Sequence, residues 1–239
     1  MIGLDRPLRP EWIYNILGII QPGEKPGIYN LPFEEIAQEL VGKEGKRKAR
    51  TVIFRSYIYS MQEQTNIVEP NVFLHWAGKY SLNELKPIFL SKLMMDYKIA
   101  RGVVKRIFYV IQPDRTFSVK LLQKQMVQAF GDRDVVKRSV NSFLATLVHF
   151  GVCIKNDDSY RLIELEPLTE TQYSLFIITY MKGYLHADSM DLDTIEPEFH
   201  QLFNLEKIYD VAKQFHRIHW EYIRDHGRNI LLLKNTIPQ

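Results

Sequence analysis

The sequence predicts a mainly α-helical protein with one small β-hairpin and a short terminal strand. Apolar residues recur at helical spacing over most of the chain, and only two stretches alternate like strands. The first stretch, residues 152–165, consists of two short runs separated by the turn residues Lys155 to Ser159. The second stretch is Ile230 to Leu233, a candidate terminal strand that would pair with an earlier hairpin.

Most of the helix patterns carry a recognisable start signal. Pro10 and Pro32 stand at or just before the first turns of two of them, and Asn71 can cap a third. Ser81 and Glu84 have the spacing of a capping box. We expect helices over residues 11–20, 32–40, 51–62, 71–79, from 81 onward, 98–112, 117–130, 133–150, 169–182 and 205–225.

The helix over residues 133–150 and the hairpin that follows it carry the most information. Asp132 can cap the helix at its start, and Gly151 can end it. Five apolar residues share one helical face: Val136, Val140, Phe143, Leu144 and Leu147. Five polar residues fall on the face expected to meet solvent: Arg133, Lys137, Arg138, Asn141 and Ser142.

Together with the helix before it, this pattern resembles a winged helix-turn-helix domain over residues 117–165. In that family the second helix enters the DNA major groove and the hairpin forms the wing. The resemblance implies that the five polar residues of the helix, and Lys155 in the hairpin, contact DNA. Arg and Asn suit base edges, and Lys suits phosphates. Winged helices also dock onto proteins, and the same face also fits an ordinary solvated helix.

The formal net charge of +3 conceals a strong asymmetry along the chain. Residues 1–42 carry a net charge of −3, residues 43–138 carry +11, and residues 139–239 carry −5. A basic centre between acidic ends is typical of a surface that binds a polyanion. The alternative is that the basic centre folds against the acidic ends and the charges pair.

A second basic stretch supports the polyanion interpretation. Residues 43–50 precede or open the expected third helix, and they hold Lys43, Lys46, Arg47, Lys48 and Arg50. With the two helices before them, they suggest another helix-turn-helix-like unit. Cations near a helix N-terminus oppose the helix dipole, which favours a functional reason for their position. A solvated basic turn is the alternative.

Catalytic motifs are missing from the sequence. It has no phosphate-binding glycine loop and no nucleophile elbow, so we expect no enzyme activity, cofactor or metal. Cys153 is the single cysteine and stands in a predicted apolar strand, which indicates a core residue and a reducing compartment. No apolar run is long enough to span a membrane, and no signal peptide is evident, so we expect a cytoplasmic protein.

These patterns predict three regions: residues 1–66, 67–166 and 167–239. The expected function is non-catalytic binding of double-stranded DNA as a regulator or accessory subunit. The alternative is a docking adaptor that uses the winged helix to bind protein partners in a larger complex. The helical layout is also similar to that of the DNA-binding accessory proteins of BREX phage-defence systems, the BrxA-like group. That resemblance concerns architecture alone and implies a role in phage defence. The sequence does not specify an oligomeric state.

Overall fold

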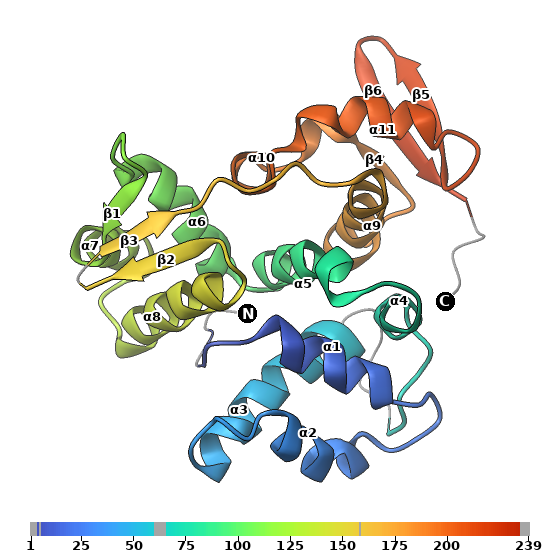
Figure 1. Ribbon diagram of the computed structural model, residues 1–239. Coiled ribbons are helices and arrows are strands. Elements are labelled where there is room, and N and C mark those ends of the chain that lie inside the picture. Colours follow the sequence, from blue (N-terminus) through green and yellow to red (C-terminus); the bar gives the residue numbers. More distant parts are fainter. Residues whose placement is uncertain (1–3, 5, 60–65, 158, 235–239) are drawn as a thin grey trace.

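Three groups of elements surround one central helix, α5 (Leu82–Asp96), in the computed structural model (Figure 1). The structure describes residues 4, 6–59, 66–157 and 159–234. The predicted capping box opens α5: the Ser81 side chain accepts from the Glu84 amide, and the Glu84 carboxylate accepts from the Ser81 amide. From Ile88 to Met95 every side chain of α5 is buried. The protein is therefore mainly α-helical, as predicted, and is organised around a helix with no solvent face over those residues.

The regular elements in the described part of the N-terminal group are all helices. It contains α1 (Pro10–Ile19), a 3-10 turn (Pro26–Tyr29), α2 (Asn30–Ile36), α3 (Lys43–Ile53) with a π-helical extension (Phe54–Ile58), and α4 (Val72–Lys79). Asn71 caps α4 as predicted, since its side chain accepts from the amides of Phe73 and Leu74. The predicted helix over 51–62 differs, because residues 43–50 are themselves helical; residues 60–62 lie outside the described part of the chain.

The middle group combines three helices with a small sheet. It contains α6 (Lys98–Val110), β1 (Thr116–Ser118), α7 (Val119–Phe130), α8 (Asp134–His149), β2 (Cys153–Asn156) and β3 (Ser159–Leu162). The strands are antiparallel, in the order β1-β3-β2. Residues 116–118 form a strand before α7, and the Phe117 ring stacks on Tyr160 of β3 at a centroid distance of 5.9 Å. The prediction of a helix starting at Phe117 is wrong for this reason.

α7 packs closely on α6. A Cβ atom at Gly102 of α6 would lie 2.7 Å from the Phe130 ring at the end of α7, so only glycine allows this approach. The predicted apolar stripe of α8 is confirmed, because all five of its residues are fully buried. Gly151 has a positive φ of 72° directly after the helix, as expected of a helix stop.

The C-terminal group also combines helices with a sheet. It contains α9 (Glu170–Tyr180) with a π-helical extension (Met181–Leu185), β4 (Ser189–Asp191), a 3-10 turn (Leu192–Thr194), α10 (Pro197–Phe203), a 3-10 turn (Leu205–Lys207), α11 (Ile208–Gln214), β5 (Trp220–Asp225) and β6 (Arg228–Leu233). The strands are antiparallel, in the order β4-β6-β5. The predicted terminal strand is confirmed as part of β6. Its predicted pairing with an earlier hairpin is wrong, because β6 pairs with β4 and β5 in a sheet separate from the β2–β3 hairpin.

The long helix predicted over residues 205–225 is wrong. α11 ends at Gln214, and the chain reverses through Arg217, whose φ is +67°. Trp220 then opens β5, is fully buried, and donates its indole N–H to the Ala212 carbonyl at 2.8 Å. Pairing with β6 satisfies the backbone hydrogen-bonding groups of residues 220–225. These strand hydrogen bonds take the place of those that a continued helix would form.

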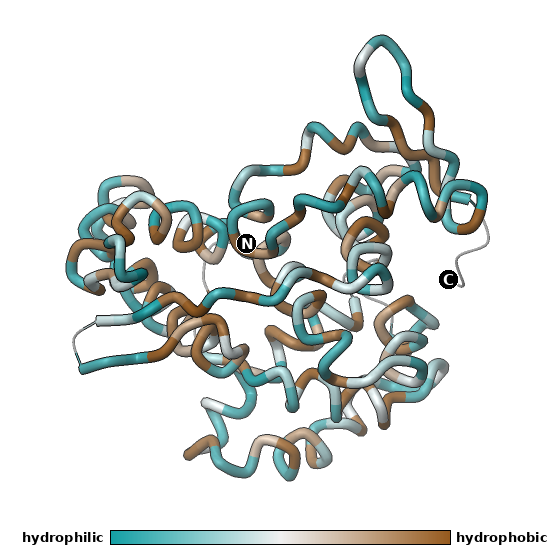
Figure 2. Tube along the Cα trace, turned by 45° about the horizontal axis from the view of Figure 1, so that its top comes forward, coloured by the Kyte–Doolittle hydropathy of each residue, from teal (hydrophilic) through white to brown (hydrophobic). Residues whose placement is uncertain are grey.

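Buried apolar side chains from all three groups form one continuous cluster, from Leu4 to Leu231. Along the trace, hydrophobic stretches lie on the inner helices, whereas the tip of the β5–β6 hairpin is hydrophilic (Figure 2). The N-terminal segment joins the groups directly. The Leu4 amide donates to the Ser139 hydroxyl at 3.1 Å, and the Leu8 amide donates to the Thr146 hydroxyl at 3.0 Å, both on α8. Within the described residues, no helix has the length and apolar character needed to cross a membrane.

Candidate nucleic-acid interface

The exposed face of α8 is the first part of the candidate interface. Arg138 and Asn141 are exposed on it, one helical turn apart. The Arg138 guanidinium makes no hydrogen bond or ion pair within the described part of the chain. Asn141 is oriented from α7, because its Oδ1 accepts from Gln123 Nε2 at 2.8 Å. An unpaired cation therefore lies beside a positioned amide.

The other two cations predicted on this face are partly engaged at the start of α8. Lys137 pairs with Asp132 at 2.6 Å, and this hydrogen bond raises the lysine pKa. Arg133 is exposed and donates from Nη2 to the Phe130 carbonyl at 2.8 Å, across the turn between α7 and α8. Asp132 does not cap the helix; Arg133 occupies the cap position without a side-chain cap. Both cations remain at the surface but have partners of their own.

Ser142 does not belong to the exposed face, and its prediction as a contact residue is wrong. It is buried, with only 9 % of its surface exposed. Ser139, Ser142 and Thr146 share a side of α8, and the N-terminal segment covers that side through the Leu4 and Leu8 hydrogen bonds. In the sequence, small polar residues at such a contact give the same pattern as a solvent-exposed face. Here Ser139 and Thr146 accept hydrogen bonds from backbone amides of the N-terminal segment instead of from water.

The hairpin β2–β3 carries two more cations, both exposed. Lys155 is exposed near the tip, as predicted. Arg161 is exposed on β3 and pairs in register with Ile154, on the outer face of the sheet. The side chains of both cations lack hydrogen bonds and ion pairs to any described residue. Arg161 was not among the residues predicted from the sequence, although its position between the buried residues Tyr160 and Leu162 indicates an outward side chain.

α7 adds two more exposed cations that the sequence analysis missed, Lys120 and Lys124. They are four residues apart, so they lie on one face of the helix. Their side chains have no recorded partner within the described ranges. Their signal in the sequence is the helical stripe of α7, on which Leu122 and Met126 are buried and positions 120 and 124 fall outside.

The basic residues of α3 are largely engaged within the protein. Arg47 donates two hydrogen bonds to Glu44, at 2.8 and 2.9 Å, and Lys48 approaches the same carboxylate at 3.6 Å. The Arg47 bonds lower the Glu44 pKa to about 2. Lys46 donates to the Glu34 carbonyl oxygen at 2.7 Å. Lys43, at the first position of α3, is exposed without a recorded partner in the described chain.

Arg50, the last of the predicted α3 residues, is half-buried in a surface hollow. Desolvation lowers its pKa, which the nearby Glu34 partly offsets. The hollow has a volume of about 330 Å³, and its lining consists of Pro26, Gly27, Asn30, Arg50, Thr51, Phe54, Arg55 and Tyr59. Arg50 therefore differs from Arg47 and Lys48, which form ion pairs with Glu44, in being partly desolvated.

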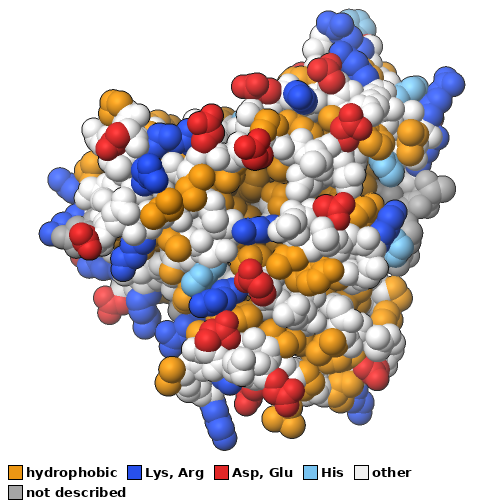
Figure 3. Space-filling view, viewed as in Figure 1, with side chains coloured by type: hydrophobic (Ala, Val, Ile, Leu, Met, Phe, Trp, Pro, Cys, Tyr) orange, Lys and Arg blue, Asp and Glu red, His pale blue; other side chains and the backbone are white. Residues whose placement is uncertain are grey.

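The two basic regions, on α3 and on α8, can be located relative to each other in Figure 1. α3 lies below α8 on the same side of the molecule (Figure 1). In the same view, Lys and Arg side chains gather at the left and lower left, over the middle group (Figure 3). The unengaged cations Arg138, Lys155 and Arg161 all belong to that group.

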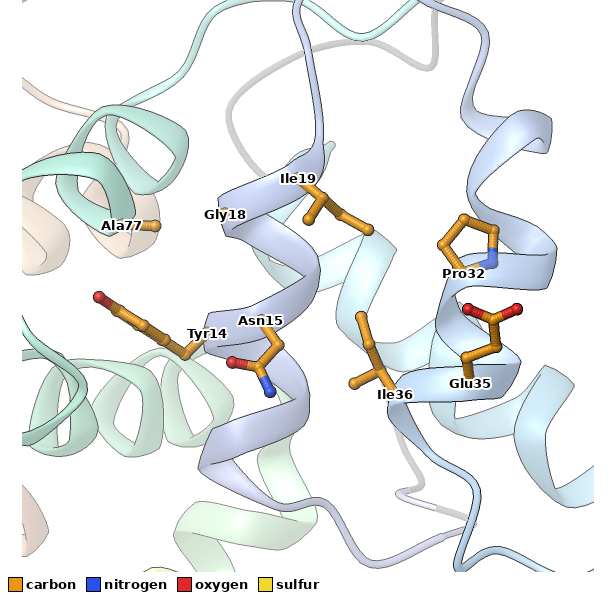
Figure 4. A pocket seen from close by; sticks show the side chains of 8 residues that line it. All are labelled: Tyr14, Asn15, Gly18, Ile19, Pro32, Glu35, Ile36 and Ala77. Atoms are coloured by element: carbon orange, nitrogen blue, oxygen red, sulfur yellow. The ribbon is translucent and has the colours of Figure 1, made fainter.

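A larger hollow, of about 590 Å³, lies between α1 and α2. Ile19 and Ile36 point into it, and Glu35 is the one carboxylate among its lining residues (Figure 4). In the described chain, no group of three or more His, Cys, Asp or Glu side chains is placed to hold a metal ion. The hollow thus offers neither a metal-ligand set nor a paired acid and base.

Two histidines near the C-terminus and the single cysteine take part in hydrogen bonding and packing within the fold. His216 Nδ1 accepts from the Tyr222 amide at 2.9 Å, and His219 stacks on Phe215 at 5.1 Å. Cys153 is buried, and burial raises its pKa to about 12, so the thiol stays protonated at neutral pH.

In comparisons with known proteins, the chain matches no family model, no curated protein and no solved structure.

Proposed function

We propose that residues 98–162 form a winged helix-turn-helix domain that binds double-stranded DNA without catalysing a reaction. In this proposal α8 enters the major groove, and the β2–β3 hairpin acts as the wing beside it. The protein would act as a DNA-binding regulator or as the DNA-binding subunit of a larger assembly.

The order of elements supports the domain assignment. A helix, a short strand, two helices joined by the three-residue turn Gly131–Arg133, and a hairpin follow one another, and the first strand adds to the edge of the hairpin. Gly131 has a φ of +86°, so this tight turn depends on a backbone conformation that glycine adopts readily. This is the arrangement in which a helix-turn-helix presents its second helix to a groove.

Arg138 is the single observation that carries the proposal. It is exposed on α8, and the structure gives its guanidinium no ion pair or hydrogen bond in the described residues. An arginine in this state can bind a guanine edge with two hydrogen bonds without first breaking an internal pair. Asn141, one turn further along, has the amide geometry that suits adenine, once its bond to Gln123 rearranges.

Phosphate contacts would come from the cations around α8. Four cations are exposed and form no ion pair with the residues that the structure describes: Lys120 and Lys124 of α7, and Lys155 and Arg161 of the hairpin. Their binding to phosphates would break no ion pair among those residues. Arg47 and Lys48 of α3 would first have to leave Glu44. We therefore assign α3 a secondary role in phosphate binding, beside the cations of the middle group.

A salt series tests the proposal. Binding to a random duplex should weaken steeply with salt, because each neutralised phosphate contributes about 0.9 to the slope of log K against log salt. A slope of about −3.6 or steeper is expected if the four flanking cations engage. A protein-docking module would bind the duplex weakly at every salt concentration and show no such slope.

A further inference from the structure

The middle and C-terminal groups have the same architecture, although their sequences show no repeat. In both, a helix precedes a short strand, two further helices and a terminal hairpin. The sheet orders correspond as well, because β1-β3-β2 and β4-β6-β5 both place the first strand against the last. α6, α7 and α8 thus correspond to α9, α10 and α11, and the β2–β3 hairpin corresponds to the β5–β6 hairpin.

The two hairpins also agree in register at their tips. Each closes with a two-residue turn, after the pair Asn156 and Ser159 in one and the pair Asp225 and Arg228 in the other. The first turn residue has a positive φ in both, +37° at Asp157 and +46° at His226.

Superposing the turns by position places Lys155 on Arg224 and Ile154 on Ile223. Both isoleucines are partly exposed, at 40 % and 39 %. Both basic residues are exposed and make no recorded hydrogen bond or ion pair with described residues. The second hairpin therefore carries a cation, Arg224, at the position where the first hairpin has Lys155, its proposed phosphate contact.

The second hairpin carries its second cation directly beside the turn and has longer strands. Arg228 is exposed on the other side of the turn without a recorded partner in the described residues, and the neighbouring Asp225 is bonded to His226 at 2.5 Å. β5 and β6 have six residues each, against four in β2 and β3. The hairpin projects from the top of the molecule, where Lys and Arg side chains gather at its tip (Figures 1 and 3).

The helix before this hairpin is unlike α8. α11 has only seven residues, its exposed Lys213 lies 3.8 Å from Asp210, and Gln214 is bonded to Glu170. It offers no unpaired arginine to a base edge. Any contact of the C-terminal group with nucleic acid would therefore be made by the hairpin. The hairpin would bind the phosphate backbone and not the base edges.

We propose that the C-terminal group is a second winged unit and that Arg224 and Arg228 on its hairpin bind the phosphate backbone of DNA. This inference rests on the proposed function, since the ligand is the same duplex. The second contact adds affinity by holding a longer duplex at two places on one chain, and it leaves sequence preference to α8.

The test compares the variant Arg224→Ala/Arg228→Ala with the control Lys25→Ala/Lys207→Ala. The control removes the same charge from exposed lysines outside the hairpin. Binding of fluorescent duplexes of about 12 and about 30 base pairs, roughly one and three helical turns, is measured across a salt series. On the longer duplex, the hairpin variant should lose about 1.8 from the salt slope, and the control should lose less than half of that. The ratio of affinities for a preferred and a random long duplex should stay unchanged.

Each outcome separates the two proposals. If the wild type binds with a steep salt slope and the folded hairpin variant matches the control on both duplexes, the second wing is wrong and the proposed function stands. If the hairpin variant changes the preferred-to-random ratio, backbone binding by the hairpin is wrong. If the wild type binds neither duplex, both proposals fail.

Discussion

The backbone amide of Leu4 donates a hydrogen bond to the Ser139 hydroxyl, across 135 residues of sequence. With the parallel bond from the Leu8 amide to Thr146, it fixes the start of the chain along one side of α8. The N-terminal segment therefore packs along α8, the helix that we propose to read DNA. The orientation of α8 depends on these two hydrogen bonds.

Thr146→Val should destabilise the protein by about 1–3 kcal/mol, because it leaves the buried Leu8 amide without an acceptor while keeping the side-chain shape. Urea unfolding measures the change. Ser142→Ala is the matched control on the same side of the helix, since no side-chain hydrogen bond is recorded for Ser142 in the described residues, and it should cost less. Equal costs for the two variants would contradict the role given to the N-terminal segment.

Val140→Asp should unfold the protein, because Val140 is fully buried and the substitution places an unpaired charge in the core. Arg138→Ala, two residues away, should change the free energy of unfolding by about 0.5 kcal/mol or less, because Arg138 is exposed and has no hydrogen bond or ion pair with any residue that the structure describes. Circular dichroism through a thermal ramp distinguishes the two. A folded Val140→Asp protein would show that α8 packs differently.

The difference between these two positions could be predicted from the sequence, whereas the burial of Ser142 could not. Helical periodicity alone places Val136, Val140 and Phe143 inside and Arg138 outside. The burial of Ser142 depends on a segment more than 130 residues away, which local pattern does not encode. Local signals with their own hydrogen-bond geometry, such as Ser81 with Glu84, were predicted correctly.

The failed prediction of a helix over residues 205–225 has a similar cause. Phe215, Ile218 and Tyr222 fit helical spacing, and the turn at Arg217 contains no glycine or proline that would signal a break. Strand pairing with β6 and the buried indole of Trp220 decide the outcome, and both are tertiary interactions. The correspondence between the two groups was also hidden in the sequence, because it lies in strand order rather than in residue identity.

A buried ion pair lies in α5, where Lys92 Nζ is 2.5 Å from Asp96 and the lysine is fully buried. Lys92→Met and Asp96→Leu should each cost about 3–5 kcal/mol, because each removes the opposite charge from a charged group that stays buried. The double variant should recover most of that loss. The control Lys213→Met breaks the exposed pair with Asp210 and should cost about 0.5 kcal/mol or less.

The pH dependence of the single variant gives a second check of this pair. Burial lowers the Lys92 pKa, and Asp96 opposes that shift. In Asp96→Asn the opposing charge is gone, so the lysine pKa falls further and the folded chain binds fewer protons than the unfolded chain. Stability of this variant should therefore rise with pH up to the unfolded lysine pKa, about 10.4. A flat profile between pH 6 and about 10 would show that the lysine is hydrated.

Cys153 should react with a thiol reagent only when the protein unfolds. Its pKa of about 12 leaves a thiolate fraction of ~10⁻⁴ at pH 8, and the side chain is buried. The rate of reaction with Ellman's reagent should follow the unfolded fraction through a urea series. Rapid reaction without denaturant would show that the β2 strand opens in the native state.

The central claim is that α8 reads DNA, and the most direct measurement is the affinity of Arg138→Ala for a duplex selected from a random pool by the wild type. The loss should be on the order of 1–3 kcal/mol on the selected duplex and smaller on random duplex, because a base contact is lost only where the right base is present. Asn141→Ala should behave in the same way, with the fold of both variants intact. If both folded variants bind the selected and random duplexes as the wild type does, α8 does not read DNA.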